Sequence, residues 1–140
     1  MIVNEFLTTA LDFISLDDIK TEYKIRGTFA DYVIQIKSKK YIVIEVKKMS
    51  EELSQKEHLK QAVDYAANEG IEWVLLTNGR QFEFYKVFFE KPINTRKVFS
   101  LNLADGSALQ KSVSCLQFLT RGMVRKRGLE TLWSRRCALD

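Results

Sequence analysis

Two runs of alternating residues, 32–36 and 41–46, dominate the hydrophobic pattern of this chain, and the polar segment 37–40 separates them. Both runs are rich in β-branched and aromatic side chains, which favour strands. Because side chains of a strand point alternately to its two faces, each run has one uniformly apolar face. The pattern therefore predicts a β-hairpin.

The register of this hairpin follows from matching the two apolar faces. Such a match requires a loop with an odd number of residues, such as 37–39. That loop sets Ile34 against Ile42 and Tyr32 against Ile44. A slip of one residue would turn one apolar face toward a polar one, so the hydrophobic pattern itself selects the register.

The same register brings three charged residues together at one end of the hairpin. Asp31 is placed opposite Glu45 on the face away from the isoleucines, and Lys47 shares that face. Two neighbouring carboxylates can bind a hard divalent cation through oxygen, and a lysine beside them can position or activate water. A purely structural interpretation stays open at this point, because Lys47 could simply neutralise two surface acids.

The N-terminal part of the chain is predicted to add a helix and a strand. Apolar residues at helical spacing indicate an amphipathic helix at 2–14. Alternation indicates a strand at 21–26, and Gly27 allows the turn into the hairpin.

After Lys48 the hydrophobic period changes to 3.6, which predicts a helix. Ser50 is a suitable N-cap and Gly70 a suitable residue just past the C-terminus, so the helix should have about five turns. A right-handed crossover would carry it over the sheet to a parallel strand at 73–77. Its buried stripe is expected to contain Leu59, Ala62, Val63 and Ala66.

The second half of the chain is predicted to complete the sheet and to add two helices. Asn78-Gly79 is a strong turn signal between strands at 73–77 and 81–88. The fold class is therefore α/β, a central mixed sheet flanked by helices, with further helices at the C-terminus. A last strand, a turn and these helices are expected at 97–103, 105–106, 108–120 and 123–138. The inward residues are expected to be Leu109, Val113, Leu116 and Leu119 on the first helix and Leu129, Leu132 and Trp133 on the second.

Composition fits one globular domain. The 140 residues are 46% hydrophobic and 29% charged, and no apolar run approaches the ~20 residues that span a bilayer. The N-terminus also lacks the order of a signal peptide, so we expect a cytoplasmic protein without membrane contact. Cys115, Cys137 and the single histidine, His58, support neither a disulfide framework nor a zinc site.

The chain carries a modest positive charge. The formal net charge is +4, which permits nucleic-acid binding without establishing it. A basic surface at 121–136 could follow a phosphate backbone, although such helices are more often simply solvated. Its basic residues, opposed only by Glu130, are Arg121, Arg125, Lys126, Arg127, Arg135 and Arg136.

Asp31 followed by Glu45-Val46-Lys47 resembles the signature of the PD-(D/E)XK nuclease superfamily. The longer run resembles the N-terminal nuclease domain of type I restriction endonuclease R subunits. Gln61 and Tyr65 have the Gln-x-x-x-Tyr spacing of that branch, and Leu76-Thr77-Asn78-Gly79 followed by Phe82-Glu83-Phe84-Tyr85 matches its next hairpin. Ala30 departs from the pattern, since the family usually has proline there.

The resemblance covers about residues 2–103. It implies one restriction-endonuclease-like domain over 1–140, with the core at about 2–103 and a C-terminal helical extension at 107–138. The implied activity is magnesium-dependent hydrolysis of phosphodiester bonds in DNA within a restriction system. The ATP-driven motor of a full R subunit is not expected in 140 residues without a Gly-x-x-x-x-Gly-Lys-Ser/Thr loop.

The resemblance also implies a set of metal ligands. Asp31, Glu45 and the backbone carbonyl of Val46 would hold Mg²⁺, for which Mn²⁺ can substitute. The family often adds an acid from the opening helix, and Glu5 is the candidate by position. A solvated acid that suits the helix dipole is the structural alternative for Glu5.

Three further side chains have roles by resemblance. Lys47 would position the attacking water or stabilise charge on the phosphate. Gln61 and Tyr65 would orient phosphate or metal-bound water. The structural alternatives are an ordinary packing aromatic for Tyr65 and a surface residue for Gln61.

DNA is the implied partner, and specificity subunits, motor subunits or further copies of this chain are candidate protein partners. Two alternatives stand beside the restriction-type nuclease. One is a non-catalytic nucleic-acid-binding or assembly module with the same fold, since fold does not dictate function. The other is a nuclease of the Holliday-junction-resolvase or repair type that uses the same site.

Overall fold

The computed structural model describes residues 19–25, 28–48, 53, 56–102, 114, 116–125 and 127–135. Within these ranges six strands form one sheet in sequential order, and only β3 and β4 are parallel. The strands are β1 (Ile19–Ile25), β2 (Thr28–Ile36), β3 (Lys39–Val46), β4 (Trp73–Thr77), β5 (Gln81–Phe88) and β6 (Asn94–Asn102). The helices are α3 (Lys56–Glu69), the 3-10 helix η3 (Gln117–Leu119), α5 (Arg121–Arg125) and α6 (Gly128–Ser134).

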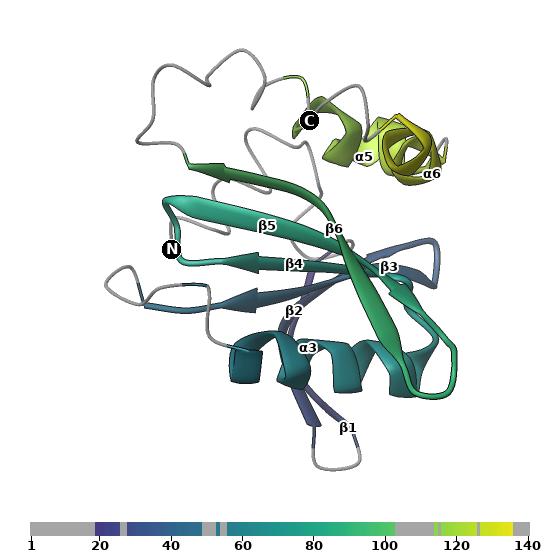
Figure 1. Cartoon of the computed structure of the whole chain (residues 1–140). Coiled ribbons are helices and arrows are strands. Elements are labelled where there is room, and N and C mark those ends of the chain that lie inside the picture. The colour runs from purple at the N-terminus through teal and green to yellow at the C-terminus, as the bar shows by residue number, and fades with distance from the viewer. Residues whose placement is uncertain are drawn as a thin grey trace.

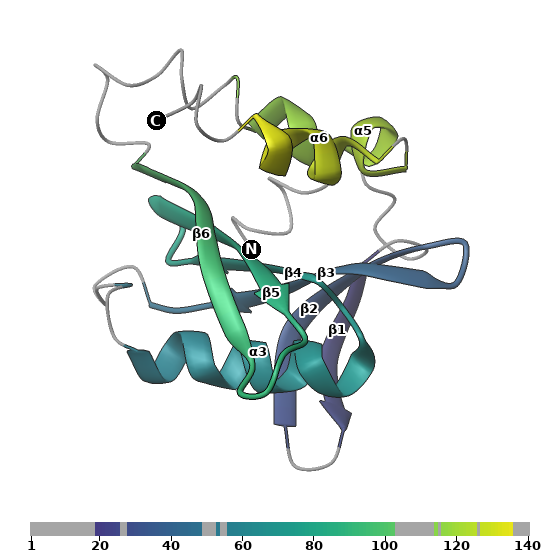
Figure 2. The ribbon, with the colours of Figure 1, turned by 45° about the vertical axis from the view of Figure 1, so that its right-hand side comes forward.

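The sheet separates two apolar layers. In Figures 1 and 2, α3 covers one face of the sheet, while α5 and α6 lie over the other. The α3 layer is built on Val33, Val43 and Leu76. The opposite layer is built on Ile34 and Ile44 and includes buried residues of the C-terminal helices. The predicted α/β class, a mixed sheet flanked by helices, is confirmed.

The predicted register of the β2–β3 hairpin is also confirmed. Ile34 pairs with Ile42, and Tyr32 pairs with Ile44. All four side chains are buried on the face opposite α3. The hydrophobic match between the strands was therefore sufficient to set the pairing.

The prediction of a three-residue loop at 37–39 in this hairpin is wrong. The turn contains only Lys37 and Ser38, both with positive φ (50° and 69°), and Lys39 already pairs with Ile36. A two-residue turn of this hand matches the twist of the strands. The register shift between Ile34 and Gln35 takes up the extra residue, so a bulge replaces the longer loop.

Helix α3 ends as predicted and packs with the predicted stripe. Gly70 has φ +70°, and the Ile71 N–H donates to the Ala66 carbonyl at 2.9 Å, which is the Schellman arrangement. The helix has 14 residues, about four turns, and the proposed cap Ser50 lies outside the described residues. Its buried stripe contains Ala62, Val63 and Ala66, with Leu59 partly buried.

The turn between β4 and β5 is built around Asn78, and both strands have the predicted bounds. The side-chain oxygen of Asn78 accepts hydrogen bonds from the N–H groups of Arg80 (3.1 Å) and Gln81 (2.8 Å). Gly79 has φ +92°, a conformation that suits glycine. Strand β6 begins at Asn94 rather than at 97, because its pairing with β5 continues to Phe88.

The expected helix at 123–138 is wrong, because α5 and α6 are separate helices. Arg127 between them is left-handed (φ 64°, ψ 33°), which ends the helical path. A Cβ atom at Gly128 would lie 2.6 Å from the Met123 carbonyl oxygen, so only glycine allows this close turn. Leu129 and Leu132 are buried as predicted.

Several other predicted elements differ in their bounds or lie outside the described residues. Strand β1 begins at Ile19 instead of residue 21. The described end of the helix predicted at 108–120 is the 3-10 helix η3. No helix among the described ranges is long and apolar enough to cross a membrane. The helix at 2–14, the turns at Gly27 and 105–106, Leu103, Leu109 and Val113 lie outside the described residues.

Candidate functional site

Asp31 lies where strands β2 and β3 stop pairing. The ladder ends at the pair Tyr32 and Ile44, and the next position in the same register puts Asp31 across from Glu45. The backbone N–H of Val46 donates a hydrogen bond of 2.8 Å to the Asp31 Oδ2. The carboxylate thus satisfies a backbone donor beyond the end of the ladder, and this contact fixes Asp31 beside β3.

Glu45 is a buried carboxylate on the face of the sheet that α3 covers. Only 4% of its surface is exposed. Its Oε1 accepts a hydrogen bond from Lys47 Nζ at 3.1 Å, while Oε2 is buried and has no hydrogen-bond partner among the described residues. A buried acceptor without a donor is unusual and costs free energy, so Oε2 is a candidate ligand for a cation.

The surroundings of Glu45 favour the protonated form of its carboxyl group. Burial and then the nearby charge of Asp31 raise the pKa of Glu45, while the hydrogen bond and charge of Lys47 oppose that rise. A single ammonium group therefore does not fully compensate two carboxylates at this depth. An additional positive charge would stabilise the ionised form of Glu45.

Contacts of both the backbone and the side chain hold Lys47 just after the end of β3. Its backbone N–H donates to the Thr77 carbonyl on β4 at 2.8 Å. Its ammonium group lies against Glu45, and the side chain is 16% exposed. The predicted convergence of Asp31, Glu45 and Lys47 is present in the structure.

Gln61 and Tyr65 differ in their exposure. The Tyr65 ring is fully buried in the layer between α3 and the sheet, with Val33 and Val43. Gln61 is exposed on α3, and no hydrogen bond among the described residues joins it to Asp31. Both positions suit the structural alternatives, a packing aromatic and a surface residue, and the catalytic roles stay predictions.

The ligand atoms available at this site are oxygens, the type that a magnesium ion binds. The two carboxylates of Asp31 and Glu45 come from adjacent strands, and the Val46 carbonyl would be a third oxygen. No group of three or more His, Cys, Asp or Glu residues gathers in the part of the chain that the structure describes. Glu5 and the side chain of His58 lie outside that part.

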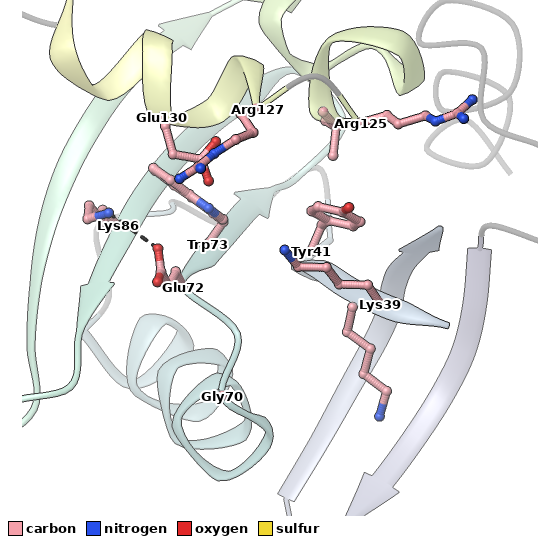
Figure 3. A pocket seen from close by; sticks show the side chains of 11 residues that line it. Lys39, Tyr41, Gly70, Glu72, Trp73, Lys86, Arg125, Arg127 and Glu130 are labelled. Atoms are coloured by element: carbon pink, nitrogen blue, oxygen red, sulfur yellow. Dashed lines mark hydrogen bonds and ion pairs between the residues drawn. The ribbon is translucent and has the colours of Figure 1, made fainter. Parts of the chain in front are cut away.

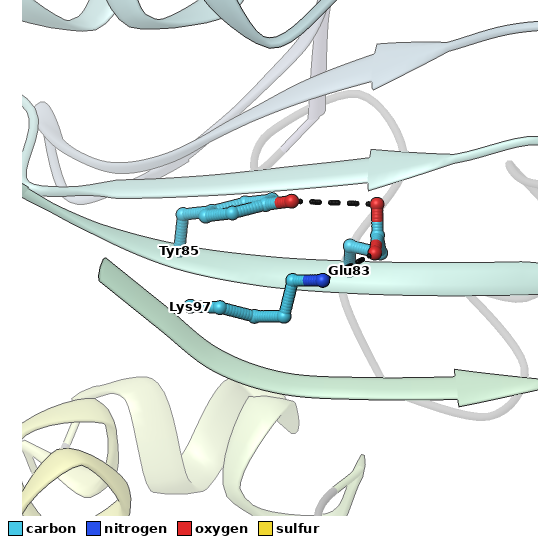
Figure 4. Close-up of polar contacts among 3 residues, drawn as sticks. All are labelled: Glu83, Tyr85 and Lys97. Atoms are coloured by element: carbon cyan, nitrogen blue, oxygen red, sulfur yellow. Dashed lines mark hydrogen bonds and ion pairs between the residues drawn. The ribbon is translucent and has the colours of Figure 1, made fainter. Parts of the chain in front are cut away.

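A second polar cluster on this side of the sheet was not found from sequence. Glu83, Tyr85 and Lys97 lie on β5 and β6 (Figure 4): Glu83 accepts from Lys97 Nζ at 2.8 Å and from the Tyr85 hydroxyl at 3.3 Å. Burial, and then the Glu83 carboxylate, raise the pKa of Tyr85. These groups satisfy one another, which indicates a structural role. The alternation of polar and apolar residues at 82–85 was the available signal.

The structure describes part of the predicted basic surface at 121–136. Arg125, Arg127 and Arg135 are exposed and Arg121 is half-buried, whereas Lys126 and Arg136 lie outside the described residues. Contact of this surface with DNA remains a prediction.

Comparison with protein families identifies a relationship for most of the chain. The model of the family "Type I restriction enzyme R protein N terminus" matches residues 4–95. This range contains Asp31, Glu45, Lys47, Gln61 and Tyr65, and it ends within β6. Searches of curated proteins and of solved structures gave no significant match.

Proposed function

Since the chain belongs to the family of the type I restriction enzyme R protein N terminus, we propose that it is a metal-dependent DNA endonuclease of the PD-(D/E)XK type. The observation that carries this proposal is the buried Glu45 Oε2, which lacks a hydrogen-bond donor among the described residues and lies beside a second carboxylate, Asp31. A site that accepts a divalent cation accounts for both features.

Asp31, Glu45 and the Val46 carbonyl would hold the metal. A bound Mg²⁺, or Mn²⁺ in its place, would polarise the scissile phosphate and lower the pKa of bound water. Asp31 accepts the Val46 N–H through Oδ2, so its other oxygen is the one proposed as a ligand. Glu45 would contribute Oε2, because Oε1 already binds Lys47.

Lys47 would act on the substrate. An ammonium group has three donors, and one of them is directed to Glu45 at 3.1 Å. The other two can hold a water molecule or an oxygen of the phosphate, and the positive charge would stabilise negative charge that develops there. The partial exposure of Lys47 leaves its side chain within reach of a bound strand.

Gln61 and Tyr65 have supporting roles in the proposal. The exposed amide of Gln61 would contact a substrate phosphate, whereas Tyr65 would act from a buried position against the sheet. DNA is the proposed substrate. Specificity or motor subunits, or further copies of this chain, are the proposed partners that would deliver it.

A non-catalytic nucleic-acid-binding or assembly module is the second candidate function. The burial of Glu45 favours it, since a carboxylate that is 4% exposed with a raised pKa can persist as a structural group. This candidate predicts salt-sensitive DNA binding without magnesium-dependent cleavage.

Cleavage assays with purified protein test these functions. Wild type is expected to cut DNA with magnesium and to leave 3′-hydroxyl and 5′-phosphate ends, and Asp31→Asn and Lys47→Ala should not. Asp64→Asn and Lys60→Ala remove exposed charges on α3 and serve as matched controls. Equal cleavage by all five proteins would reject the proposed roles. A preference for branched over linear and single-stranded DNA would identify the resolvase or repair type.

A further inference from the structure

A pocket of about 550 Å³ lies at the opposite end of β3 from the acid pair. It opens between the first residues of β3, the start of β4 and helices α5 and α6 (Figure 3). Lys39 at its edge precedes Glu45 by six residues, which is about 20 Å along a strand. The pocket is therefore separate from the proposed nuclease site, and its volume is in the range of small-ligand sites.

The lining of this pocket has an excess of positive charge. Two of its lysines are neutralised, because Lys40 pairs with Glu69 and Lys86 pairs with Glu72 at 3.4 Å. Lys86 also lies 4.6 Å from the ring centre of Trp73, so it is fixed at the inner wall. The charged residues that remain are Lys39, Arg125 and Arg127, opposed by Glu130.

Lys39 and Arg127 approach the pocket from opposite walls. Figure 3 shows both side chains directed inward, whereas the guanidinium group of Arg125 points away. The Lys39 ammonium lies 5.0 Å from the ring centre of Tyr41, which holds it against the β3 wall. No ion pair of Lys39 or Arg127 occurs among the residues that the structure describes.

The backbone of Arg127 supports a role for its side chain. This residue has φ 64° and ψ 33°, the left-handed region, which is unfavourable for a residue with a Cβ atom. Glycine or asparagine would adopt that conformation more readily. Strained residues of this kind concentrate at ligand sites. Here the strained position carries a guanidinium group into the pocket.

We propose that this pocket binds a small phosphorylated ligand of nucleotide size, with its phosphate between Lys39 and Arg127. The planar guanidinium group forms paired hydrogen bonds to phosphate oxygens, and the ammonium group adds a second charge. A phosphate monoester dianion matches the charge of the two cations. It would attract them more strongly than the single carboxylate of Glu130 does. The proposal is independent of the nuclease function.

Calorimetric titration at low salt, with EDTA present to exclude metal-dependent binding, tests this site. Adenosine 5′-monophosphate and inorganic pyrophosphate should bind to wild type, and adenosine should not. Lys39→Gln and Arg127→Asn should each weaken binding at least tenfold. Asparagine tolerates the left-handed conformation, so Arg127→Asn should keep its thermal unfolding midpoint close to that of wild type.

Two controls decide the result. Arg135→Gln removes an exposed arginine at the end of α6 that does not line the pocket, and Asp31→Asn alters the distant acid pair. Both should bind adenosine 5′-monophosphate like wild type. Absence of binding to both phosphate probes would overturn the proposal, as would equal weakening by Arg135→Gln. Binding of a hexathymidylate strand alone would also overturn it, since that result indicates a nucleic-acid surface.

Discussion

The Val46 N–H donates a hydrogen bond of 2.8 Å to the Asp31 carboxylate, across the point where β2 and β3 stop pairing. This contact gives Asp31 a structural role in addition to its proposed role as a ligand. It also fixes the carboxylate beside Glu45, whose pKa responds to the charge of Asp31. The geometry of the candidate site therefore depends on one bond between a side chain and a backbone group.

Replacement of Asp31 should separate these two roles. Asp31→Asn keeps an oxygen that can accept the Val46 N–H, whereas Asp31→Ala leaves that donor unsatisfied. Both variants lose the repulsion with Glu45, so their difference reports the hydrogen bond. We expect Asp31→Asn to be more stable than Asp31→Ala by about 1 kcal/mol in urea denaturation. Equal stability of the two variants would show that the bond contributes nothing.

Glu45 should make stability depend on pH. Its pKa in the folded protein is raised, so the folded state holds the proton more strongly than the unfolded chain. Its contribution is therefore present below the unfolded value of about 4.3 and is lost as pH rises through the folded value. A tenfold difference in proton affinity between the folded and unfolded states corresponds to about 1.4 kcal/mol of stability.

Glu45→Gln removes this titration while its amide oxygen can still accept from Lys47. The variant should be more stable than wild type at pH 8, and the difference should disappear at pH 4. Chemical denaturation at the two pH values measures it. A difference that is the same at both values would contradict the raised pKa.

Gln61 offers a test of function without loss of fold, because its side chain is exposed. Gln61→Ala should change the free energy of unfolding by less than about 0.5 kcal/mol. If Gln61 orients the phosphate, magnesium-dependent cleavage should fall about tenfold or more, within the range of catalytic positioning effects. Gln81→Ala, which alters a glutamine at the β4–β5 turn, is a comparison variant. Unchanged cleavage by Gln61→Ala would assign Gln61 to the surface alone.

The close approach of Gly128 to Met123 predicts opposite effects for two glycines. A Cβ atom at Gly128 would meet the Met123 backbone at 2.6 Å, whereas one at Gly122 would meet nothing within 4 Å. Gly128→Ala should therefore destabilise the protein by about 1–3 kcal/mol. Gly122→Ala, within α5, should stabilise it by up to about 1 kcal/mol. Thermal unfolding of both variants would test the contact.

The sequence predicted the central hairpin and the acid pair because a single constraint, burial of the isoleucine face, sets both. Ile34 and Ile42 cannot pair out of register without exposing an apolar face. The position of Glu45 follows from that pairing. The turn at Lys37 and Ser38 could not be predicted in this way, because a bulge and a longer loop give the same register.

The C-terminal helices show where hydrophobic periodicity fails. Leu129 and Leu132 were assigned to the core correctly, but the break between α5 and α6 was missed. The break depends on the left-handed backbone of Arg127 and on the space that only Gly128 leaves for Met123. Such steric constraints arise from tertiary contacts and leave little trace in a pattern of apolar residues. The pocket beside Arg127 was missed for the same reason.

Titration with Mn²⁺, followed by electron paramagnetic resonance, tests the central claim most directly, because it detects the ion independently of cleavage. Wild type should bind one Mn²⁺ that Mg²⁺ displaces, and binding should strengthen as pH rises and Glu45 ionises. Asp31→Asn and Glu45→Gln should each weaken it at least tenfold, whereas Asp64→Asn should not. Absence of a bound ion in wild type, or equal affinity in all four proteins, would contradict a metal site at Asp31 and Glu45.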